Sequence, residues 1–263
     1  MLITSTKNPR VKQIIALRER RERVRTGLTR VEGYEEVSLA LHSGAEPRTL
    51  YFCPDLIREE QQSLVEQIQR AGAELIEVSL PVFERMAYRE GPDGWLATFP
   101  SPERALTDAR LGNLPFVVIG EAIEKPGNLG AIVRTADAAG VDAIVSSDPR
   151  TDWGNPNVVR ASKGALFTMQ VAQASNDDTL GWLREHHMQV VVATPSAPLR
   201  YTDVDLRVPV AIVVGTEKHG VSERWLQEAD IAVQIPMFGK VNSLNVATAT
   251  ALLIYEVVRQ RQR

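Results

Sequence analysis

The chain has 263 residues, of which 44% are hydrophobic and 24% are charged, and its formal net charge is −3 at pH 7. This composition predicts a globular protein, and the length allows one large domain or two smaller ones. The apolar runs are far shorter than the ~20 residues of a membrane span, and the first residues lack a signal-peptide core, which indicates a cytoplasmic protein. The single cysteine, Cys53, excludes an internal disulfide, and the four scattered His residues form no metal-ligand pattern.

The basic residues are concentrated at the start of the chain. Residues 1–30 contain nine Lys and Arg against two Glu, so this segment carries +7 in a chain of net charge −3. Within it, VKQIIALRERRERVR has four apolar residues before its arginines, which predicts a helix with one buried stripe and a basic exposed end. Such a face attracts phosphates, although a solvated helix with neighbouring Arg and Glu shows the same pattern.

Helical and strand-like patterns then alternate as far as residue 100. The sequence predicts helices over 31–44 and 56–72, and strands over 49–54, 74–79 and 93–100. These elements form a small α/β unit. The polar stretch between Pro100 and Pro115 is the best candidate for a connection to the rest of the chain. We therefore place domains at 1–104 and 115–263, with a linker at 105–114.

The second part of the chain has the pattern of a parallel sheet covered on both faces by helices. Strand-like apolar runs cover 116–120, 143–148, 189–195, 210–215 and 231–236, and helical stretches separate them. Ligands of such folds bind beyond the carboxyl ends of the strands, so the loops that follow the strands are the candidate site.

The first of these loops is GEAIEKPGNLGAIVRTADAAG, in which Asn128 opens a helix that carries Arg134. Neither G-x-G-x-x-G nor G-x-x-x-x-G-K-[ST] occurs, so dinucleotide and P-loop sites are unsupported. The second loop, VVGTEKHGVSERW, places Gly215, Glu217 and Gly220 before a helix that Ser222 would cap. Its glycines suit either a tight turn or the close approach of a ligand.

The third loop begins the stretch IPMFGKVNSLNVATATALLIYE and leads into a long apolar helix. Ser243 or Asn242 could cap this helix, which leaves Asn245 as an additional amide that a cap does not require. Glycines or small residues beside a polar side chain in three such loops indicate one shared site.

These three segments, in this order, resemble the motifs of the SpoU (TrmH) family of RNA 2′-O-ribose methyltransferases, part of the SPOUT superfamily. TDWGNPNVVRASKGALF resembles the intermediate segment of the family, and STKNPRVKQI with RVEGYEEVSLAL resembles a small ribosomal-protein-like substrate-binding domain. The resemblance implies methyl transfer from S-adenosyl-L-methionine, a deep trefoil knot in the C-terminal parallel-sheet domain, and a homodimer. It implies no metal.

By position in the motifs, the resemblance implies that Gly215, Ile235 and Leu244 hold the cofactor through backbone groups. Arg134 would be the central catalytic residue. Because a guanidinium is effectively never deprotonated, we expect Arg134 to bind the RNA phosphate and to stabilise the developing alkoxide, with proton abstraction as the weaker alternative.

The resemblance assigns further roles around Arg134. Asn128 and Asn245 would orient the ribose and Arg134, Glu217 would be an acidic partner, and Ser243 would point toward the reacting centre. The same resemblance makes an interface of the helix over 246–259. The apolar face of this helix, which we expect to form part of the homodimer interface, consists of Val246, Leu253, Ile254, Val257 and Val258.

The expected substrate is ribosomal RNA, most of all 23S ribosomal RNA, with transfer RNA as the alternative. A catalytically silent RNA-binding or ribosome assembly factor would keep the same fold. Ser162 is a further candidate for RNA contact. The basic residues expected to contact RNA are Arg20, Arg21, Arg23, Arg25 and Arg160.

Overall fold

The computed structural model describes residues 1–216 and 218–262, and it divides into two compact units. Unit 1 consists of residues 1–102 and 152–168. Unit 2 consists of residues 103–151 and the chain from residue 169 onward. Residues 152–168 therefore make their main contacts with the N-terminal part of the chain, although in the sequence they come between two segments of unit 2.

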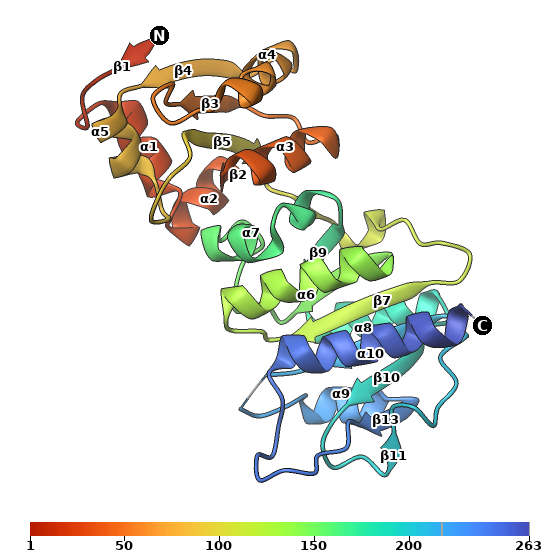
Figure 1. The fold of residues 1–263 in the computed structure, drawn as a ribbon. Coiled ribbons are helices and arrows are strands. Elements are labelled where there is room, and N and C mark those ends of the chain that lie inside the picture. The colour runs from red at the N-terminus through yellow and green to blue at the C-terminus, as the bar shows by residue number, and fades with distance from the viewer. Residues whose placement is uncertain (217, 263) are drawn as a thin grey trace. The chain divides into compact units, whose positions relative to one another are not determined.

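Unit 1 is built on a five-stranded mixed sheet with the order β1-β4-β3-β5-β2 (Figure 1). Its central strand β3 pairs in parallel with β4, where Thr49 lies opposite Glu74, and antiparallel with β5, where Thr49 lies opposite Thr98. The strands are β1 (Leu2–Ile3), β2 (Leu28–Glu32), β3 (Thr49–Phe52), β4 (Glu74–Val78) and β5 (Trp95–Pro100).

The helices of unit 1 cover this sheet and bury residues such as Ile14, Ile76 and Phe83 in one apolar cluster. They are α1 (Pro9–Ala16), α2 (Arg20–Thr26), α3 (Tyr34–His42), α4 (Ser63–Arg70), α5 (Leu80–Met86) and α7 (Pro156–Ser162), with the short helices η1 (Glu59–Gln61) and η3 (Ala165–Phe167).

The basic N-terminal segment forms two helices, where the sequence pattern predicted one. Asn8 caps α1 by accepting a hydrogen bond from the backbone N–H of Arg10, and Pro9 occupies the first helical position. The chain then leaves the helical conformation at Glu19, and α2 ends at Gly27, whose φ of +66° is readily available to glycine. The break separates the apolar residues of α1 from the arginines of α2.

Unit 2 contains an eight-stranded sheet with the order β11-β13-β10-β12-β7-β8-β9-β6, in which the described strand pairs are parallel. This confirms the predicted parallel-sheet α/β fold. The strands are β6 (Glu103–Arg104), β7 (Phe116–Glu121), β8 (Ala143–Ser147), β9 (Gln170–Ala174), β10 (Gln189–Ala193), β11 (Leu199–Arg200), β12 (Val210–Val214) and β13 (Ile231–Gln234).

Helices lie along both faces of this sheet. On one side α10 packs against α6 and β12, and α8 and α9 pack against β8 and β10 (Figure 1). Apolar residues of alternate strand positions, among them Val117 and Val213, form the core beneath α8 and α9 together with helix residues such as Trp225 of α9. The helices are η2 (Leu106–Asp108), α6 (Pro126–Ala139), α8 (Asn176–Glu185), α9 (Glu223–Glu228) and α10 (Val246–Arg261).

The apolar face that was expected to form a subunit interface is largely used inside unit 2. Val246, Leu253, Ile254 and Val257 are buried, so this part of the prediction is wrong: packing of α10 on α6 and β12 already covers those side chains. The exposed apolar residues of α10 are instead Leu252 and Tyr255. Among the described residues, no helix combines the length and the apolar character needed to cross a membrane.

Candidate functional site

A cavity of about 470 Å³ lies beyond the carboxyl ends of β10, β12 and β13. The loops that follow these three strands form its wall, and the first turn of α10 completes it. This volume is within the range of small-molecule and cofactor sites. The structure places Gly215, Ser243, Leu244 and Ile235 in this wall, so one cavity collects four residues that the sequence singled out.

Gly215 is buried where the loop after β12 folds back on itself. A Cβ atom at this position would collide with the backbone of Gly220 and Val221. The turn is closed by two backbone hydrogen bonds, since Thr216 and Gly220 each donate their N–H to the carbonyl of the other at 2.9 Å. Glycine is therefore required here by the close approach of the loop's own backbone. Glu217, the predicted acidic partner, lies outside the described residues.

Asn245 is the residue that caps α10. Its side-chain oxygen accepts hydrogen bonds from the backbone N–H groups of Ala247 at 3.0 Å and Thr248 at 3.3 Å. The prediction that Ser243 or Asn242 forms the cap is therefore wrong. Both precede the helix by more than one residue, and both line the cavity instead.

The other half of the Asn245 amide joins two of the motifs. Its nitrogen donates a hydrogen bond of 3.0 Å to the side-chain oxygen of Asn128, which lies in the first turn of α6. The side chain of Asn245 thus binds its own helix and a loop from another part of the sheet at once. These two sets of contacts explain why Asn245 is polar, which a cap formed by Ser243 would not have explained.

Arg134 lies on α6, six residues after Asn128, and is exposed. Six residues correspond to about 9 Å along a helix axis. No hydrogen bond or ion pair joins the Arg134 side chain to another described residue, and Arg134 is not in the wall of the cavity. The structure therefore brings Asn128 and Asn245 into contact, but it leaves the guanidinium of Arg134 available for an anion.

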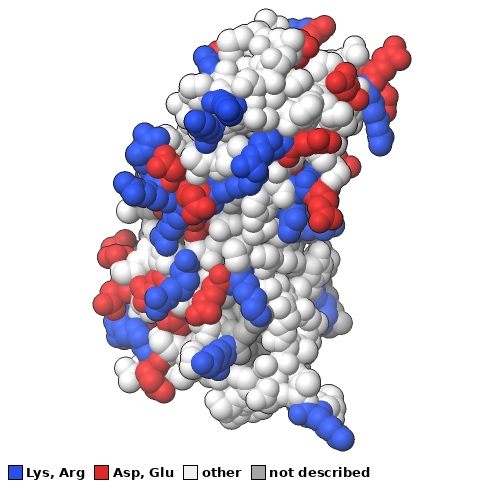
Figure 2. Space-filling model, turned by 90° about the vertical axis from the view of Figure 1, so that its left-hand side faces the viewer, with Lys and Arg blue, Asp and Glu red and all other residues white. Residues whose placement is uncertain are grey.

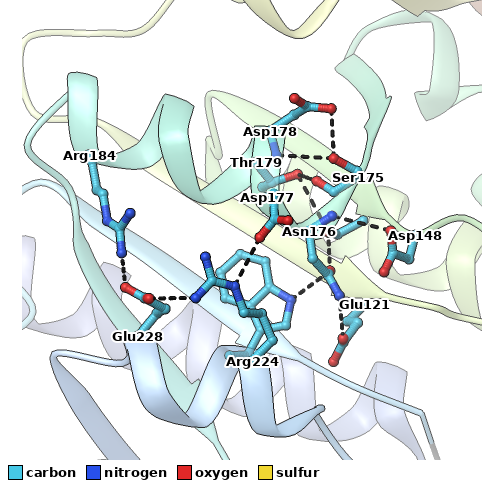
Figure 3. Close-up of polar contacts among 12 residues, drawn as sticks. Glu121, Asp148, Ser175, Asn176, Asp177, Asp178, Thr179, Arg184, Arg224 and Glu228 are labelled. Carbon is cyan, nitrogen blue, oxygen red and sulfur yellow. Dashed lines mark hydrogen bonds and ion pairs between the residues drawn. The ribbon is translucent and has the colours of Figure 1, made fainter.

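Glu121 is a buried carboxylate at the end of β7 that the sequence analysis did not identify. One carboxylate oxygen accepts a hydrogen bond of 2.8 Å from the side-chain amide of Asn176 (Figure 3). The other accepts a hydrogen bond of 2.7 Å from the backbone N–H of Ser222. Ser222 immediately follows the cavity loop. Its hydroxyl makes no capping bond to α9, so the N-cap position is correct but the capping bond is absent.

Asn176 extends this network into the core between α8 and α9. Its side-chain oxygen accepts hydrogen bonds from the indole N–H of Trp225 at 2.8 Å and from the hydroxyl of Ser147 at 2.5 Å. Together with Glu121, these groups connect the end of β7, the end of β8 and the start of α9. An acidic residue at the end of an apolar strand was the signal in the sequence that could have identified Glu121.

Exposed ion pairs surround this buried network (Figure 3). Arg224 of α9 pairs with Asp177 of α8 at 2.9 Å and with Glu228 at 2.7 Å, and Glu228 also pairs with Arg184. Such surface pairs contribute little individually. We therefore attribute the positioning of the cavity loop mainly to Glu121 and Asn176.

Arg23 is buried, with only 6% of its surface exposed, which corrects its predicted place on an exposed basic face. Its Nε and Nη2 donate to the two carboxylate oxygens of Asp152 at 2.8 and 2.7 Å. Its Nη1 donates to the backbone carbonyls of Leu17 at 2.9 Å and Arg18 at 2.6 Å. A guanidinium so fully occupied holds the segment after β8 within unit 1 and is not available to RNA.

The other predicted basic contacts are at the surface. Arg20, Arg21 and Arg25 are exposed on α2, and Arg160 is exposed on α7. Ser162 is buried and donates its hydroxyl to the carbonyl of Val159, so this candidate for RNA contact is wrong. Figure 2 shows basic and acidic side chains interspersed over the face drawn there.

No group of three or more His, Cys, Asp or Glu within 1–216 and 218–262 is arranged to hold a metal ion. The cavity wall combines apolar, hydroxyl and amide side chains with Lys218, His219 and Glu223.

Comparison with known proteins identifies the family. The model of the SpoU rRNA Methylase family matches residues 115–255. The chain belongs to this family. Residues 8–97 match the model of the MRM3-like substrate binding domain, so the resemblance read from the motifs and from the N-terminal segment is confirmed.

Several relatives of this SpoU methylase match it over nearly its whole length. The 23S rRNA (guanosine(2553)-2′-O)-methyltransferase RlmP of Bacillus subtilis is 29% identical over 97% of this chain and 98% of its own length. The crystal structure of an RNA 2′-O ribose methyltransferase superposes on this one with a TM-score of 0.86. Its sequence is 38% identical, and the match covers 100% of both chains. The AdoMet-bound rRNA methyltransferase from Sinorhizobium meliloti is 30% identical, has a TM-score of 0.91 and covers 98% of this chain and 97% of its own.

Proposed function

We propose that this protein transfers a methyl group from S-adenosyl-L-methionine to a ribose 2′-hydroxyl of 23S ribosomal RNA. The main observation in support is that the loops of the second and third SpoU motifs enclose the 470 Å³ cavity. In addition, Asn245 of the third motif forms a hydrogen bond with Asn128 of the first. The names of the full-length relatives support the reaction, and RlmP supports 23S ribosomal RNA over transfer RNA.

The cavity suits S-adenosyl-L-methionine in size and in chemistry. Apolar side chains such as Val233 and Met237 offer surface for the adenine, and hydroxyl groups such as Thr194 and Ser243 offer hydrogen bonds to polar groups. Gly215 has no side chain to obstruct the wall. When bound, this cofactor supplies an activated methyl group on a sulfonium sulfur.

The roles of the side chains follow from where they lie. Asn128 and Asn245 fix one another through their 3.0 Å hydrogen bond, so either amide is oriented to position a ribose hydroxyl. The guanidinium of Arg134, which bonds to no other described residue, can bind a phosphate beside the target ribose and stabilise negative charge that develops on the 2′-oxygen. Ser243, in the cavity wall, contributes a hydroxyl to the same region.

Binding and transfer experiments test this function. Calorimetric titration should show that the protein binds S-adenosyl-L-methionine, and a labelled methyl group should appear in 23S ribosomal RNA. Label confined to transfer RNA would favour the alternative substrate. Binding of RNA without binding of the cofactor would favour the silent assembly factor and would contradict the proposal.

We further infer a division of labour along the chain, with RNA bound by 1–104, cofactor bound by 115–263, and 105–114 as the linker. The match of 8–97 to a substrate binding domain supports the first of these roles. A cytoplasmic location, where ribosomal RNA is modified, and the trefoil knot of the family belong to the same proposal.

A homodimer completes the proposal. The exposed side of α10 offers Leu252, 39% exposed, and Tyr255, 50% exposed, close to Tyr201 around a shallow, mainly apolar depression. Exposed apolar groups gathered in this way are typical of interaction surfaces. Light scattering should give the mass of a dimer for the wild-type protein and of a monomer for Tyr255→Asp; a wild-type monomer at micromolar concentration would contradict the proposal.

A further inference from the structure

Arg30 of β2 is a buried cation whose hydrogen-bonding capacity is only partly used. It is 2% exposed, and its Nη2 donates to a carboxylate oxygen of Glu32 at 3.0 Å and to the carbonyl of Met86 at 2.9 Å. Its Nε and Nη1 are also buried, yet neither has an acceptor among the described residues. Buried donors without acceptors are costly and uncommon, so they require an explanation.

The charge of this side chain persists at neutral pH. Burial lowers the pKa of Arg30 to about 10, and the nearby Arg18 adds to this effect, while Glu32 opposes it. The group therefore remains a guanidinium under ordinary conditions. A charged group is kept in the interior of unit 1 with two donors unused.

Arg30 lines a crevice of about 20 Å³ together with Arg89 and Arg160, and every residue of its wall belongs to unit 1. Helix α7, which carries Arg160, packs against β2, which carries Arg30. Arg89 resembles Arg30 in that its buried Nε has no hydrogen-bond acceptor among the described residues. This Nε lies 4.0 Å from a carboxylate oxygen of Glu32, and the Nη2 of Arg89 pairs with Asp93 at 2.6 Å. We call this space the Arg30 crevice.

One carboxylate, that of Glu32, lines the Arg30 crevice, and it is already engaged. It accepts hydrogen bonds from Arg30, from the backbone N–H of Tyr88 at 2.8 Å and from the backbone N–H of Arg89 at 3.3 Å. Three arginines line the crevice against two carboxylates, Glu32 in its wall and Asp93 paired with Arg89, so an excess of positive charge remains. The ligand that this arrangement favours is therefore an anion.

The size of the space narrows the choice of anion. A volume of about 20 Å³ accommodates one water-sized group, which corresponds to a single oxygen atom and excludes a nucleobase. Guanidinium groups match the geometry of phosphate oxygens, and Tyr88, Pro156 and Val159 complete the wall of the crevice. A phosphate held at the surface with one oxygen inserted satisfies these conditions.

We propose that the Arg30 crevice binds a backbone phosphate of the RNA substrate, with one oxygen accepting hydrogen bonds from Arg30 and Arg89 and with Arg160 neutralising the remaining charge. The identity of the anion rests on the proposed function of the protein as an RNA methyltransferase. The crevice fixes the position of the RNA on unit 1 and does not read its sequence, because phosphate contacts carry no base information.

The test is a salt titration of binding to a 23S ribosomal RNA transcript. Arg30→Met and Arg160→Gln should each weaken binding and make the slope of log affinity against log salt shallower by about one, as expected for the loss of one phosphate contact. Arg70→Gln is the matched control, because Arg70 is an exposed arginine of unit 1 that pairs with Glu66. It should keep the wild-type slope. A wild-type slope for Arg30→Met would overturn the proposal.

Thermal melts without RNA accompany this test. Arg30→Met should melt below the wild type, because it leaves the buried carboxylate of Glu32 and the carbonyl of Met86 without their guanidinium partner. RNA binding is therefore compared at a temperature at which the melt shows the variant to be folded. Should this variant not fold, Arg160→Gln decides alone, since Arg160 is exposed, and a wild-type slope for it would overturn the proposal.

Inorganic phosphate separates the two sources of the ligand. If the crevice binds free phosphate and not RNA, the wild-type protein should melt at a higher temperature in phosphate buffer than in chloride buffer of equal ionic strength. The variants should then show the wild-type slope of log RNA affinity against log salt. That outcome overturns the proposal. Methyl transfer is measured separately, so a protein with the expected slopes and no transfer would contradict the proposed function and leave the crevice in place.

Discussion

The side-chain nitrogen of Asn245 donates a hydrogen bond of 3.0 Å to the side-chain oxygen of Asn128, across 117 residues of sequence. The same Asn245 caps α10 through its oxygen. One amide therefore sets the start of the C-terminal helix and holds it to the first turn of α6. This contact brings the first and third SpoU motifs together beside the cavity.

The two roles of Asn245 can be separated by substitution. Asn245→Ser keeps a capping oxygen but is too short to reach Asn128, so we expect stability within about 0.5 kcal/mol of wild type and a marked loss of methyl transfer. Asn245→Ala removes the cap as well and should cost about 1 kcal/mol more. Urea unfolding and single-turnover methyl transfer measure the two effects. Full transfer activity in Asn245→Ser would show that the contact with Asn128 has no part in the reaction.

Arg134→Ala should abolish methyl transfer and leave the affinity for S-adenosyl-L-methionine nearly unchanged. The reason is that Arg134 is exposed, bonds to no other described residue and lies outside the wall of the cavity. Calorimetry and labelled-methyl transfer measure the two properties. The control is Arg207→Ala, since Arg207 is an exposed arginine of unit 2 that pairs with Asp205. Wild-type turnover in Arg134→Ala would remove Arg134 from its central role.

Glu121 is expected to act as a positioning residue for the cavity loop. Glu121→Ala leaves the backbone N–H of Ser222 and the amide of Asn176 without their buried acceptor, which should cost about 3 kcal/mol of stability and weaken cofactor binding. Glu121→Gln keeps one acceptor and should recover part of both. The control is Glu228→Gln in the partly exposed ion pairs nearby. Equal cofactor affinity in folded Glu121→Ala and wild type would show that the loop is held by other contacts.

The exposed arginines of α2 should add affinity for RNA that depends on salt. Replacement of Arg20, Arg21 and Arg25 by Gln should weaken RNA binding and flatten its dependence on salt, with cofactor affinity unchanged. Arg23 is left out because Arg23→Gln would break a buried ion pair with Asp152 and should cost about 3 kcal/mol of stability. Equal salt slopes for the triple variant and wild type would mean that these three arginines are only a solvated face.

Much of the fold could be predicted because its central strands are continuous apolar runs. Strands β7 and β12 are buried along their whole length, and their sequences are apolar apart from Glu121 at the end of β7. β9, with the sequence QVAQA, was missed because it is short and has polar residues at its first and fourth positions. β2 was missed because the basic pattern around Arg30 suggested a surface, whereas that arginine is buried.

The site was predictable where its residues lie in local motifs and was not where contacts join distant segments. Gly215, Ile235 and Leu244 were assigned through the resemblance to the family motifs, and the structure places all three in the wall of one cavity. The burial of Arg23 depends on Asp152, which is 129 residues away, so no local pattern distinguishes Arg23 from its exposed neighbours. For the same reason, Asn128 could not be recognised as the partner of Asn245.

The most direct test of the account is the chemical position of the transferred methyl group. The protein is incubated with 23S ribosomal RNA and S-adenosyl-L-methionine labelled in the methyl group, and the RNA is then hydrolysed with alkali. A 2′-O-methyl group removes the hydroxyl that attacks the adjacent phosphodiester, so the account predicts label in an alkali-resistant dinucleotide with the wild-type protein and none with Arg134→Ala. Label recovered only in mononucleotides would place the methyl group on a base and would contradict the account, as would the absence of label from RNA.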